Sequence, residues 1–308
     1  MSDMNPMNVR VANAPCSYGA FEFTVGTDPN VPDGVTVLDY VARAGYAGID
    51  LGPVGYLGDS AELSERLAER GLTLAGGYVP LPFSDPDALA GQIGYLHAML
   101  GILDLAPPGL APRPTLADAG SAERLAAPGA AASRPELGLD DDGWKRFAAG
   151  LAMAVAICRD RGYEPAFHHH LGTYVEAVWE IEKVLELTDV GLCLDTGHLL
   201  AGGGEPATGL RDWSGRINHI HLKDARRELL ASIVADRAPM TEIWRRRAFC
   251  ALGEGDVGMD EVLGVIADIG YSGWLVVEQD IFPDPAETAE EVAGRQAANR
   301  GWLRERGI

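Results

Sequence analysis

Short apolar runs that end in polar residue types recur along this chain. Four runs show the pattern, with the sequences PAFHHH, GLCLDTGH, INHIHLKD and WLVVEQD at residues 165–170, 191–198, 217–224 and 274–280. An apolar run of this length between turn signals is typical of a strand buried on both faces, as in a parallel sheet. Polar residues at the carboxyl ends of such strands are typical of the active-site end of an α/β barrel. Packing alone does not explain four strands that all end in His, Asp or Glu.

A helix, a glycine and a short apolar strand form a unit that repeats along the chain. Residues 43–50, 70–78 and 269–278 show it, and the first and third share the pattern Gly-Tyr-x-Gly. The glycine ends each helix in the left-handed conformation that only glycine adopts at low cost. Alternation of strands with helical patterns predicts βαβ units and a parallel sheet.

These patterns predict a single α/β domain over residues 1–308, a closed (β/α)8 TIM barrel, for which about 250 residues is typical. The eight predicted strands are at residues 9–14, 47–51, 72–78, 100–105, 164–169, 190–195, 217–222 and 274–278. A helix is predicted at 141–159, because Asp140 supplies an N-cap. Its apolar residues fall on one face, namely Trp144, Phe147, Leu151, Val155 and Cys158.

The segment 106–138 differs from the rest of the chain, because it is rich in Ala, Pro and Gly and has little periodicity. A loop of this length in a compact domain is usually functional or disordered. Because it would follow the fourth predicted strand, it would lie near the mouth of the active site. We interpret it either as a flexible insertion or as a lid.

Charge and cysteine content narrow the class of protein. Acidic residues outnumber basic residues by 45 to 25, which gives a formal net charge of −20. A nucleic-acid partner requires a basic surface, so this charge argues against one. No apolar run approaches the roughly 20 residues that a membrane span needs, and the start of the chain has no signal-peptide pattern. The four cysteines are scattered without paired spacing, as expected of reduced thiols in a cytoplasmic protein.

The four strand ends together offer a set of metal ligands. A divalent ion with open positions needs about three or four ligands of the His, Asp or Glu type. Asp195, His221 and Glu278 meet that need together with one histidine of the triple-His run. His168 and His170 share one face of their strand by alternation, so that the histidine between them points away. A single histidine here is more simply a core residue, but four such strand ends favour a metal site.

Other polar residues near these strand ends have two interpretations each. His198 lies about one turn beyond a predicted ligand, where it either faces the pocket or donates a hydrogen bond to a ligand carboxylate. Lys223 and Asp224 are either a surface ion pair or part of the site. Three further residues are candidates for holding substrate hydroxyls, although each is also explicable as a structural or surface residue: Glu176, His219 and Arg226.

Five motifs make the chain resemble the sugar isomerase/epimerase superfamily, whose members share the xylose-isomerase-like TIM barrel. They are FHHHLGT, LDTGH, HIHLKD, GEGD and GYSGWLVVEQD, at residues 167–173, 194–198, 219–224, 253–256 and 270–280. Within the superfamily, the triple histidine with Leu-Gly-Thr and the closing VVEQD make the chain most similar to the inosose dehydratases and their relatives. The resemblance is strong from about residue 140 to 285 and thin before that.

The resemblance implies a divalent ion on four strand ends, with Mn²⁺ as the leading expectation and Co²⁺, Mg²⁺ or Zn²⁺ as alternatives. Carried over by position, Asp195, His221 and Glu278 are ligands. Many relatives have a glutamate at the fifth-strand position, where this chain has a histidine. His168 is the expected fourth ligand and His170 is its rival. This departure lowers the negative charge around the ion.

Our leading functional hypothesis is metal-assisted dehydration of a small cyclic keto-polyol through an enediolate. His170 or Glu278 would remove the proton next to the ketone, and His198 or Lys223 would protonate the departing hydroxyl. Histidine suits this role because its unperturbed pKa lies near neutrality. Family habit also suggests a homo-oligomer.

Three other functions remain open from the sequence. A metal-dependent sugar isomerase or epimerase would use the same enediolate and return the proton elsewhere. A DNA-repair endonuclease on the same barrel would need a basic groove, which the charge of −20 disfavours. A non-catalytic metal- or sugar-binding protein is the last alternative, because fold alone does not fix function.

Overall fold

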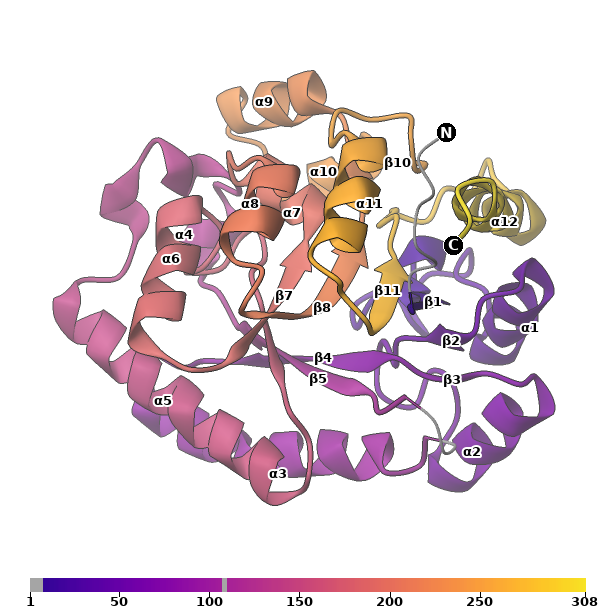
Figure 1. Ribbon diagram of the computed structural model, residues 1–308, viewed down its shortest axis with the longest axis horizontal. Helices are drawn as coiled ribbons and strands as arrows, with labels where there is room; N and C mark the ends of the chain where they lie inside the picture. Colours follow the sequence, from indigo (N-terminus) through magenta and orange to yellow (C-terminus); the bar gives the residue numbers. More distant parts are fainter. Residues whose placement is uncertain (1–7, 107–109) are drawn as a thin grey trace.

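The structure, a computed structural model, describes residues 8–106 and 110–308. Its centre is a parallel sheet with the strand order β3-β2-β1-β11-β8-β7-β6-β5-β4, wrapped into a barrel (Figure 1). The strands are β1 (Arg10–Asn13), β2 (Gly48–Ile49), β3 (Thr73–Leu74), β4 (Gly76–Leu81), β5 (Arg113–Asp118), β6 (Ala166–His168), β7 (Gly191–Asp195), β8 (Ile217–Leu222) and β11 (Trp274–Val277). A separate antiparallel pair joins β9 (Asp224–Ala225) to β10 (Phe249–Cys250).

The barrel closes because β3 and β4 are two parts of one strand, separated by Ala75. β3 pairs with β2, and β4 pairs with β5. The Ala75 N–H donates to the Ile49 carbonyl at 2.9 Å, and the Ala75 carbonyl accepts from the Arg113 N–H at 2.9 Å. Counted in this way, eight strand positions surround the barrel, which confirms the predicted (β/α)8 fold.

Helices alternate with the strands and cover the outside of the barrel (Figure 1). They are α1 (Gly34–Ala44), α2 (Ser60–Glu69), α3 (Pro86–Leu103), α4 (Ala122–Leu125), α5 (Asp141–Asp160), α6 (Val178–Leu187), α7 (Thr196–Ala201), α8 (Pro206–Asp212), α9 (Arg227–Ala235), α10 (Met240–Arg245), α11 (Met259–Asp268) and α12 (Ala289–Arg304), with 3-10 turns η1 (Pro15–Tyr18), η2 (Ala130–Ala132) and η3 (Pro135–Leu137). In the described part of the chain, no helix has the length and apolar character needed to cross a bilayer.

The predicted helix at 141–159 is confirmed as α5. The Asp140 carboxylate accepts a hydrogen bond from the Gly143 N–H at 2.7 Å, and this cap fixes where the helix begins. The apolar face predicted for this helix is buried. Periodicity and capping residues together therefore located this element.

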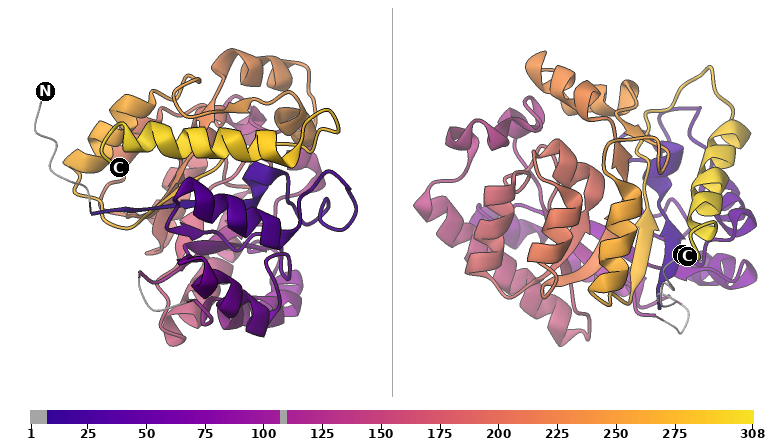
Figure 2. Two further views of the ribbon diagram at one scale, coloured as in Figure 1. Left: turned by 90° about the vertical axis from the view of Figure 1, so that its right-hand side faces the viewer. Right: turned by 45° about the horizontal axis from the view of Figure 1, so that its top comes forward.

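The first and last parts of the described chain meet at one seam of the barrel. β1 pairs with β11 in parallel register, so the last strand lies beside the first. α12 packs along α1 outside this seam (Figure 2). The Tyr46 hydroxyl donates to the Gln296 carbonyl at 2.8 Å, and this buried bond joins the two ends of the fold.

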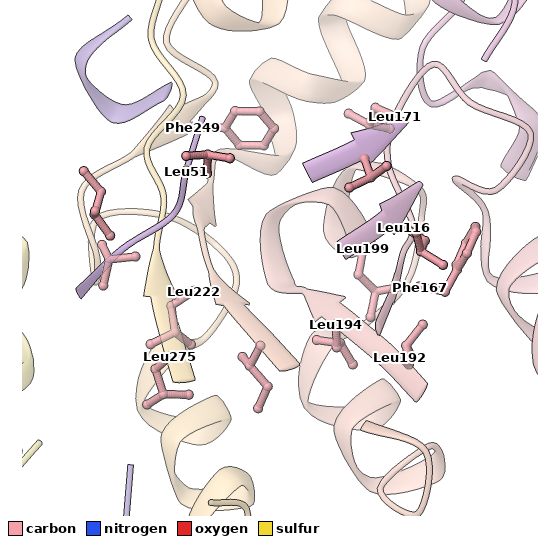
Figure 3. Close-up of a cluster of buried hydrophobic side chains, with 14 of the residues drawn as sticks. Leu51, Leu116, Phe167, Leu171, Leu192, Leu194, Leu199, Leu222, Phe249 and Leu275 are labelled. Carbon is pink, nitrogen blue, oxygen red and sulfur yellow. The ribbon is translucent and has the colours of Figure 1, made fainter. Parts of the chain in front are cut away.

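Side chains alternate between the inside and the outside of the barrel along each strand. The outward side chains form the main core between strands and helices, where Leu222 of β8 lies close to Leu275 of β11 (Figure 3). The inward positions near the amino ends of the strands hold a smaller cluster that includes Trp274. A Cβ atom on Gly48 would lie 2.8 Å from the Trp274 ring, so the glycine leaves room for this indole. The carboxyl ends remain available for polar side chains.

The predicted strand at 100–105 is wrong, because these residues largely belong to α3. Leu96, Met99, Leu100 and Leu103 of this helix are buried, a helical spacing that continues through the apolar run. The fourth barrel position is instead filled by β5, within the segment predicted to be an insertion. The sequence RPTLAD of β5 is short and half polar, so hydrophobicity alone did not identify it. The other seven predicted strands each overlap a strand of the barrel.

The segment after β5 is held to the body of the protein by a buried ion pair. Arg124 of α4 donates to both carboxylate oxygens of Glu180 in α6 at 2.9 Å, and both side chains are buried. Arg124 also lies 3.3 Å from Glu176. Residues 119–138 are therefore anchored, whereas their role as a lid over the active site stays a prediction.

We predict that Arg124→Ala lowers the free energy of unfolding by about 3–5 kcal/mol, because it leaves buried carboxylates without their cation. Urea unfolding followed by circular dichroism measures the change. Arg134→Ala is the control, since Arg134 pairs with Glu136 at the surface and its loss is expected to have no measurable effect. Equal stability of the two variants would contradict this assignment.

Candidate metal centre

The carboxyl ends of four neighbouring strands bring four ligand-type side chains together. β6, β7, β8 and β11 are adjacent in the sheet. His168, Asp195 and His221 come from the ends of the first three, and Glu278 follows the fourth. One ligand atom from each lies within 4.8 Å of the others, and all four residues are buried. The convergence expected from the sequence is therefore observed.

The Nδ1 atom of His221 is at the centre of this group, which we call the four-ligand group. It lies 3.1 Å from His168 Nε2, 3.2 Å from Glu278 Oε2 and 3.7 Å from Asp195 Oδ2. His168 Nε2 is also 3.7 Å from Asp195 Oδ2. Two imidazole nitrogens and two carboxylate oxygens at these separations form a donor set of the kind that holds Zn²⁺, Mn²⁺ or Co²⁺.

The hydrogen bonding of the group also fits a cation. Asp195 Oδ2 is buried and points at the two imidazoles, and the Lys223 ammonium lies 3.1 Å from it. The facing nitrogens of His168 and His221 share one proton at most if they bond to each other. Two buried imidazole nitrogens that face each other and two carboxylates cost free energy when they are left without enough positive charge, and coordination to a positive ion removes that cost.

Lys223 lies beside the four-ligand group as a buried cation. Its ammonium is 2.8 Å from Glu278 Oε2, 3.1 Å from Asp195 Oδ2 and 3.1 Å from Asp280 Oδ2. It also lies 3.1 Å from His198 Nε2, which accepts a hydrogen bond from it. The lysine thus contacts two of the carboxylates that would hold a metal, and it also donates a hydrogen bond to His198.

Lys223 and the acids around it shift one another's ionisation. Burial alone would lower the pKa of Lys223, but the surrounding carboxylates outweigh it and raise that pKa well above its usual range. Burial would likewise raise the pKa values of Asp195 and Glu278, but nearby cations, Lys223 among them, hold both below their usual range. For Asp280, burial prevails and the pKa is raised. The site therefore combines a permanent ammonium with two ionised carboxylates.

The triple histidine divides its roles by strand alternation, as predicted. His169 points away from the group, and its Nε2 accepts the backbone N–H of Asp195 at 3.2 Å. His170 faces the same side as His168, and its Nδ1 donates to the Leu171 carbonyl at 2.7 Å. Burial lowers the pKa of His170 to about 3, so its ring is neutral near pH 7. Its Nε2 atom is then free of a proton.

A cavity of about 200 Å³ opens over the group. Its opposite wall is apolar, because Phe21 and Phe23 of the loop after η1 stack on Trp244 of α10 with ring centroids 4.8 and 5.7 Å apart. The polar side chains that line it are Glu22, Asp50, Tyr78, His168, His170, His221, Lys223, Glu278 and Asp280. The cavity thus has a charged floor and an aromatic wall.

The three residues predicted to hold substrate hydroxyls are not among the described residues that line this cavity. Glu176 is buried, where it accepts the Gly172 N–H at 2.8 Å and pairs with Arg124. Arg226 is partly exposed, and its guanidinium donates to the Arg247 carbonyl just beyond α10. His219 lies one inward position deeper than His221. The substrate-binding role of these three residues therefore stays a prediction.

Asp224 is separated from Lys223 by strand alternation, and both are buried, so they are not a surface ion pair. The Asp224 carboxylate accepts the backbone N–H groups of Gly253 and Gly255 at 2.8 and 3.0 Å. It thereby fixes the turn at 253–256. Of the two neighbours, only Lys223 belongs to the candidate site.

Asp50, Asp280 and Cys16 line the cavity, although the sequence analysis gave them no role. Asp50 follows β2 as the end of an Ala-Gly-Ile-Asp run, which is the same strand-end pattern that identified the other acids. Asp280 closes the VVEQD motif, two residues after Glu278. Applying the strand-end rule to every barrel strand would have found both aspartates, whereas no local signal marks Cys16.

Relatives of known sequence place the chain in a family. The profile described as xylose isomerase-like TIM barrel matches residues 38–305. An inosose dehydratase of Bacillus cereus is 36% identical over 149 residues, covering 47% of this chain and 49% of that protein. The inosose dehydratase of Clostridium perfringens is 35% identical over 151 residues, covering 48% and 50%. The chain spans about half the length of the curated relatives it matches.

Solved structures share the fold at low sequence identity. The IOLI protein with a binding zinc atom superposes with a TM-score of 0.71 at 14% identity, covering 97% of this chain and 99% of that one. The probable 3-DHS dehydratase AsbF of Bacillus anthracis gives 0.70 at 13% identity, covering 96% and 99%. These likenesses concern the fold alone. The resemblance inferred from the motifs is confirmed by the profile match, which extends over most of the chain, and the protein belongs to the xylose isomerase-like TIM barrel family.

Proposed function

We propose that this protein is a divalent-metal-dependent enzyme that dehydrates a neutral cyclic keto-polyol similar to 2-keto-myo-inositol. The observation that carries the proposal is the convergence of four ligand-type side chains, three of which line a cavity that His170 and Lys223 also face. The names of the two curated relatives support the reaction class, since both are inosose dehydratases.

His168, Asp195, His221 and Glu278 would hold the ion. When bound there, a divalent cation supplies Lewis-acid stabilisation of the negative charge that develops on the ketone oxygen during proton removal. The mixed nitrogen and oxygen donors suit Zn²⁺, Mn²⁺ and Co²⁺, and they favour Mg²⁺ less because it prefers oxygen ligands. The zinc atom in the structure of the IOLI protein makes Zn²⁺ a candidate equal to Mn²⁺.

His170 is the base that the geometry favours. Its Nδ1 proton is committed to the Leu171 carbonyl, so the unprotonated Nε2 can accept a proton. The low pKa of about 3, caused mainly by burial, keeps the ring neutral and available near pH 7. Glu278 is the weaker candidate, because its carboxylate already contacts Lys223 and His221.

Lys223 is the acid that the geometry favours, because it lines the cavity and His198 does not. Asp195, Glu278 and Asp280 keep its ammonium protonated and fix its position. His198 accepts a hydrogen bond from that ammonium and thereby aims it. Hydroxide is a far stronger base than the amine, so the ammonium can protonate a hydroxyl as its bond to carbon breaks.

The proposed reaction balances without a further reactant. His170 takes the proton from the carbon next to the ketone, and the electron pair forms an enediolate. The hydroxyl on the following carbon then leaves with a proton from Lys223 as water, and a carbon–carbon double bond forms. The resulting enol gains a proton on carbon as its O–H proton leaves, and it becomes a cyclic 1,2-dione. The proton held by His170 passes to Lys223, directly or through solvent, and the enzyme is restored.

The charge of the cavity favours a neutral substrate. Among the described residues that line it, Lys223 alone is a lysine or arginine, and three carboxylates surround it. A phosphate or carboxylate group would meet Glu22 and Asp50 without a cation of its own to bind. The aromatic wall offers a flat surface for the carbon–hydrogen face of a ring. An uncharged polyol therefore fits both the charged residues and the aromatic wall of the cavity.

We predict that the purified protein binds about one Zn²⁺ or Mn²⁺ per chain and that Asp195→Asn and His221→Ala lose this ion, because each removes a donor of the four-ligand group. Elemental analysis after dialysis measures the content. His97→Ala, at an exposed helix position, is the control and should retain the ion. Full metal content in Asp195→Asn and His221→Ala would contradict the proposed metal centre.

We predict that metal affinity rises with pH, by up to about tenfold per unit. Burial opposes protonation of His221, but the adjacent Cys193, Glu278 and Asp195 outweigh burial and raise the pKa of His221 well above the usual value, which favours a bound proton on the ring. An ion that binds through Nδ1 must displace that proton. Chelator competition from pH 6 to pH 8 measures the slope, and a flat profile would contradict this coupling.

We predict that the metal-loaded protein converts 2-keto-myo-inositol to an ultraviolet-absorbing dione, and that His170→Gln lowers kcat by about 10²–10⁴-fold through loss of the base. His97→Gln is the control and should keep full activity. In deuterium oxide, label entering recovered substrate without loss of water would favour an isomerase or epimerase instead. No change in absorbance and no exchange would exclude both reactions.

A further inference from the structure

A fifth strand end reaches the candidate metal centre from the side opposite the other ligands. Asp50 directly follows β2, and its Oδ2 atom lies 3.8 Å from His221 Nε2. Both side chains are almost fully buried. His221 Nε2 and Asp50 Oδ1 make no hydrogen bond with the described residues. The second ring nitrogen of the central histidine therefore faces a carboxylate across a short gap.

The backbone holds Asp50 rigidly at this place. Its N–H donates to the Asn13 carbonyl at 2.9 Å, and the next residue, Leu51, donates to the Gly76 carbonyl at 3.0 Å. A Cβ atom on Gly76 would lie 2.7 Å from a backbone oxygen and 3.1 Å from Asp50 Oδ1. Glycine at this position gives the carboxylate the space that it occupies. Neighbouring strands thus fix where Asp50 points.

The chemistry of imidazole explains how the contact between Asp50 and His221 can affect metal binding. A neutral ring carries one proton, so a histidine that binds metal through Nδ1 must carry its proton on Nε2. A carboxylate next to that N–H fixes the tautomer, orients the ring and makes the ligating nitrogen a better donor. In this protein Nδ1 of His221 faces the other three ligands, and Nε2 faces Asp50.

We propose that Asp50 is a positioning residue of the metal centre, which accepts the Nε2 proton of His221 and thereby holds Nδ1 toward the ion. This inference rests on the proposed function, since it requires a divalent ion at the four-ligand group. A closing of the 3.8 Å gap by roughly 1 Å would bring the pair to hydrogen-bond distance.

His219 offers a competing arrangement in the same region. One donor atom from each of Asp50, His219 and His221 lies within 4.8 Å of the others, deeper in the barrel than the four-ligand group. Neither ring nitrogen of His219 hydrogen-bonds to the described residues. An ion there would need His221 Nε2 without its proton, whereas a proton on Nε2 excludes that ion. A second bound ion would therefore mark the deeper arrangement.

The test compares Zn²⁺ affinity, by chelator competition at one pH, in the wild type, Asp50→Asn and Asp50→Leu. Asp50→Leu removes the acceptor and is expected to weaken binding by about 10–100-fold. Asp50→Asn keeps an acceptor oxygen but loses the charge, so its Zn²⁺ affinity should lie between those of the wild type and Asp50→Leu. Asp118→Asn is the matched control, because Asp118 is an equally buried carboxylate that caps backbone N–H groups away from the centre. Its affinity should stay within about twofold of wild type.

A spectroscopic readout separates positioning from a general loss of stability. In the Co²⁺-loaded wild type, the Nε2 proton of His221 should give a shifted, slowly exchanging proton resonance, which Asp50→Leu loses to exchange with solvent. Circular dichroism of the metal-free variants shows whether they fold. Unchanged Zn²⁺ affinity and an unchanged resonance in folded Asp50→Leu would overturn the inference and leave the proposed function intact. If the wild type binds two ions and Asp50→Leu loses one of them, Asp50 is instead a ligand of the deeper site with His219 and His221. A wild type that binds no ion would overturn the proposed function itself.

Discussion

The carboxyl end of the barrel holds several buried carboxylates, and its structure depends on neutralising their negative charge. Asp195, Glu278 and Asp280 lie within ion-pair distance of one ammonium, that of Lys223, and all four side chains are buried. A buried carboxylate without a cation is strongly destabilising. Lysine alone does not balance three acids, so protonation of Asp280 or His221, or a divalent ion, would offset the remaining negative charge. Under the proposed function, the same imbalance that makes the site costly for folding would give it affinity for a metal.

Strand alternation places the inward polar side chains of the site at different depths along the barrel axis. The inward residues along β8 are His219 and His221, and Lys223 continues the same alternation just after the strand, so that each is two residues nearer the cavity than the one before. Two histidines of one strand thereby have different surroundings: the deeper one lies in the barrel interior, and the other lies among the acids. Their chemical roles follow from depth along the barrel axis rather than from residue type.

The cavity combines two surfaces that suit different parts of one ligand. The charged floor can polarise a ketone and its neighbouring hydroxyl, while Phe21, Phe23 and Trp244 present rings to the remaining carbon skeleton. Dehydration and epimerisation share the first proton removal, so the fold and the proposed metal ligands do not separate them. Under the proposed function, the separating feature is a proton donor beside the leaving hydroxyl, and Lys223, which lines the cavity, is the donor that we propose.

The sequence by itself determined the barrel, most of its strands and the four ligand-type residues, because the period of two along buried strands and the polar residues at their ends are local properties of the chain. It did not identify β5, whose short, half-polar segment is stabilised by pairing with β4 and β6 rather than by its own composition. It also predicted that Glu176 and Arg226 hold the substrate, whereas neither is among the described residues that line the cavity. Only the tertiary structure decided that Asp50 faces His221, that Lys223 lies among three acids and that His198 stands behind it, since each contact joins strands distant in sequence. Distances between such strands are set by barrel closure, and no local pattern encodes them.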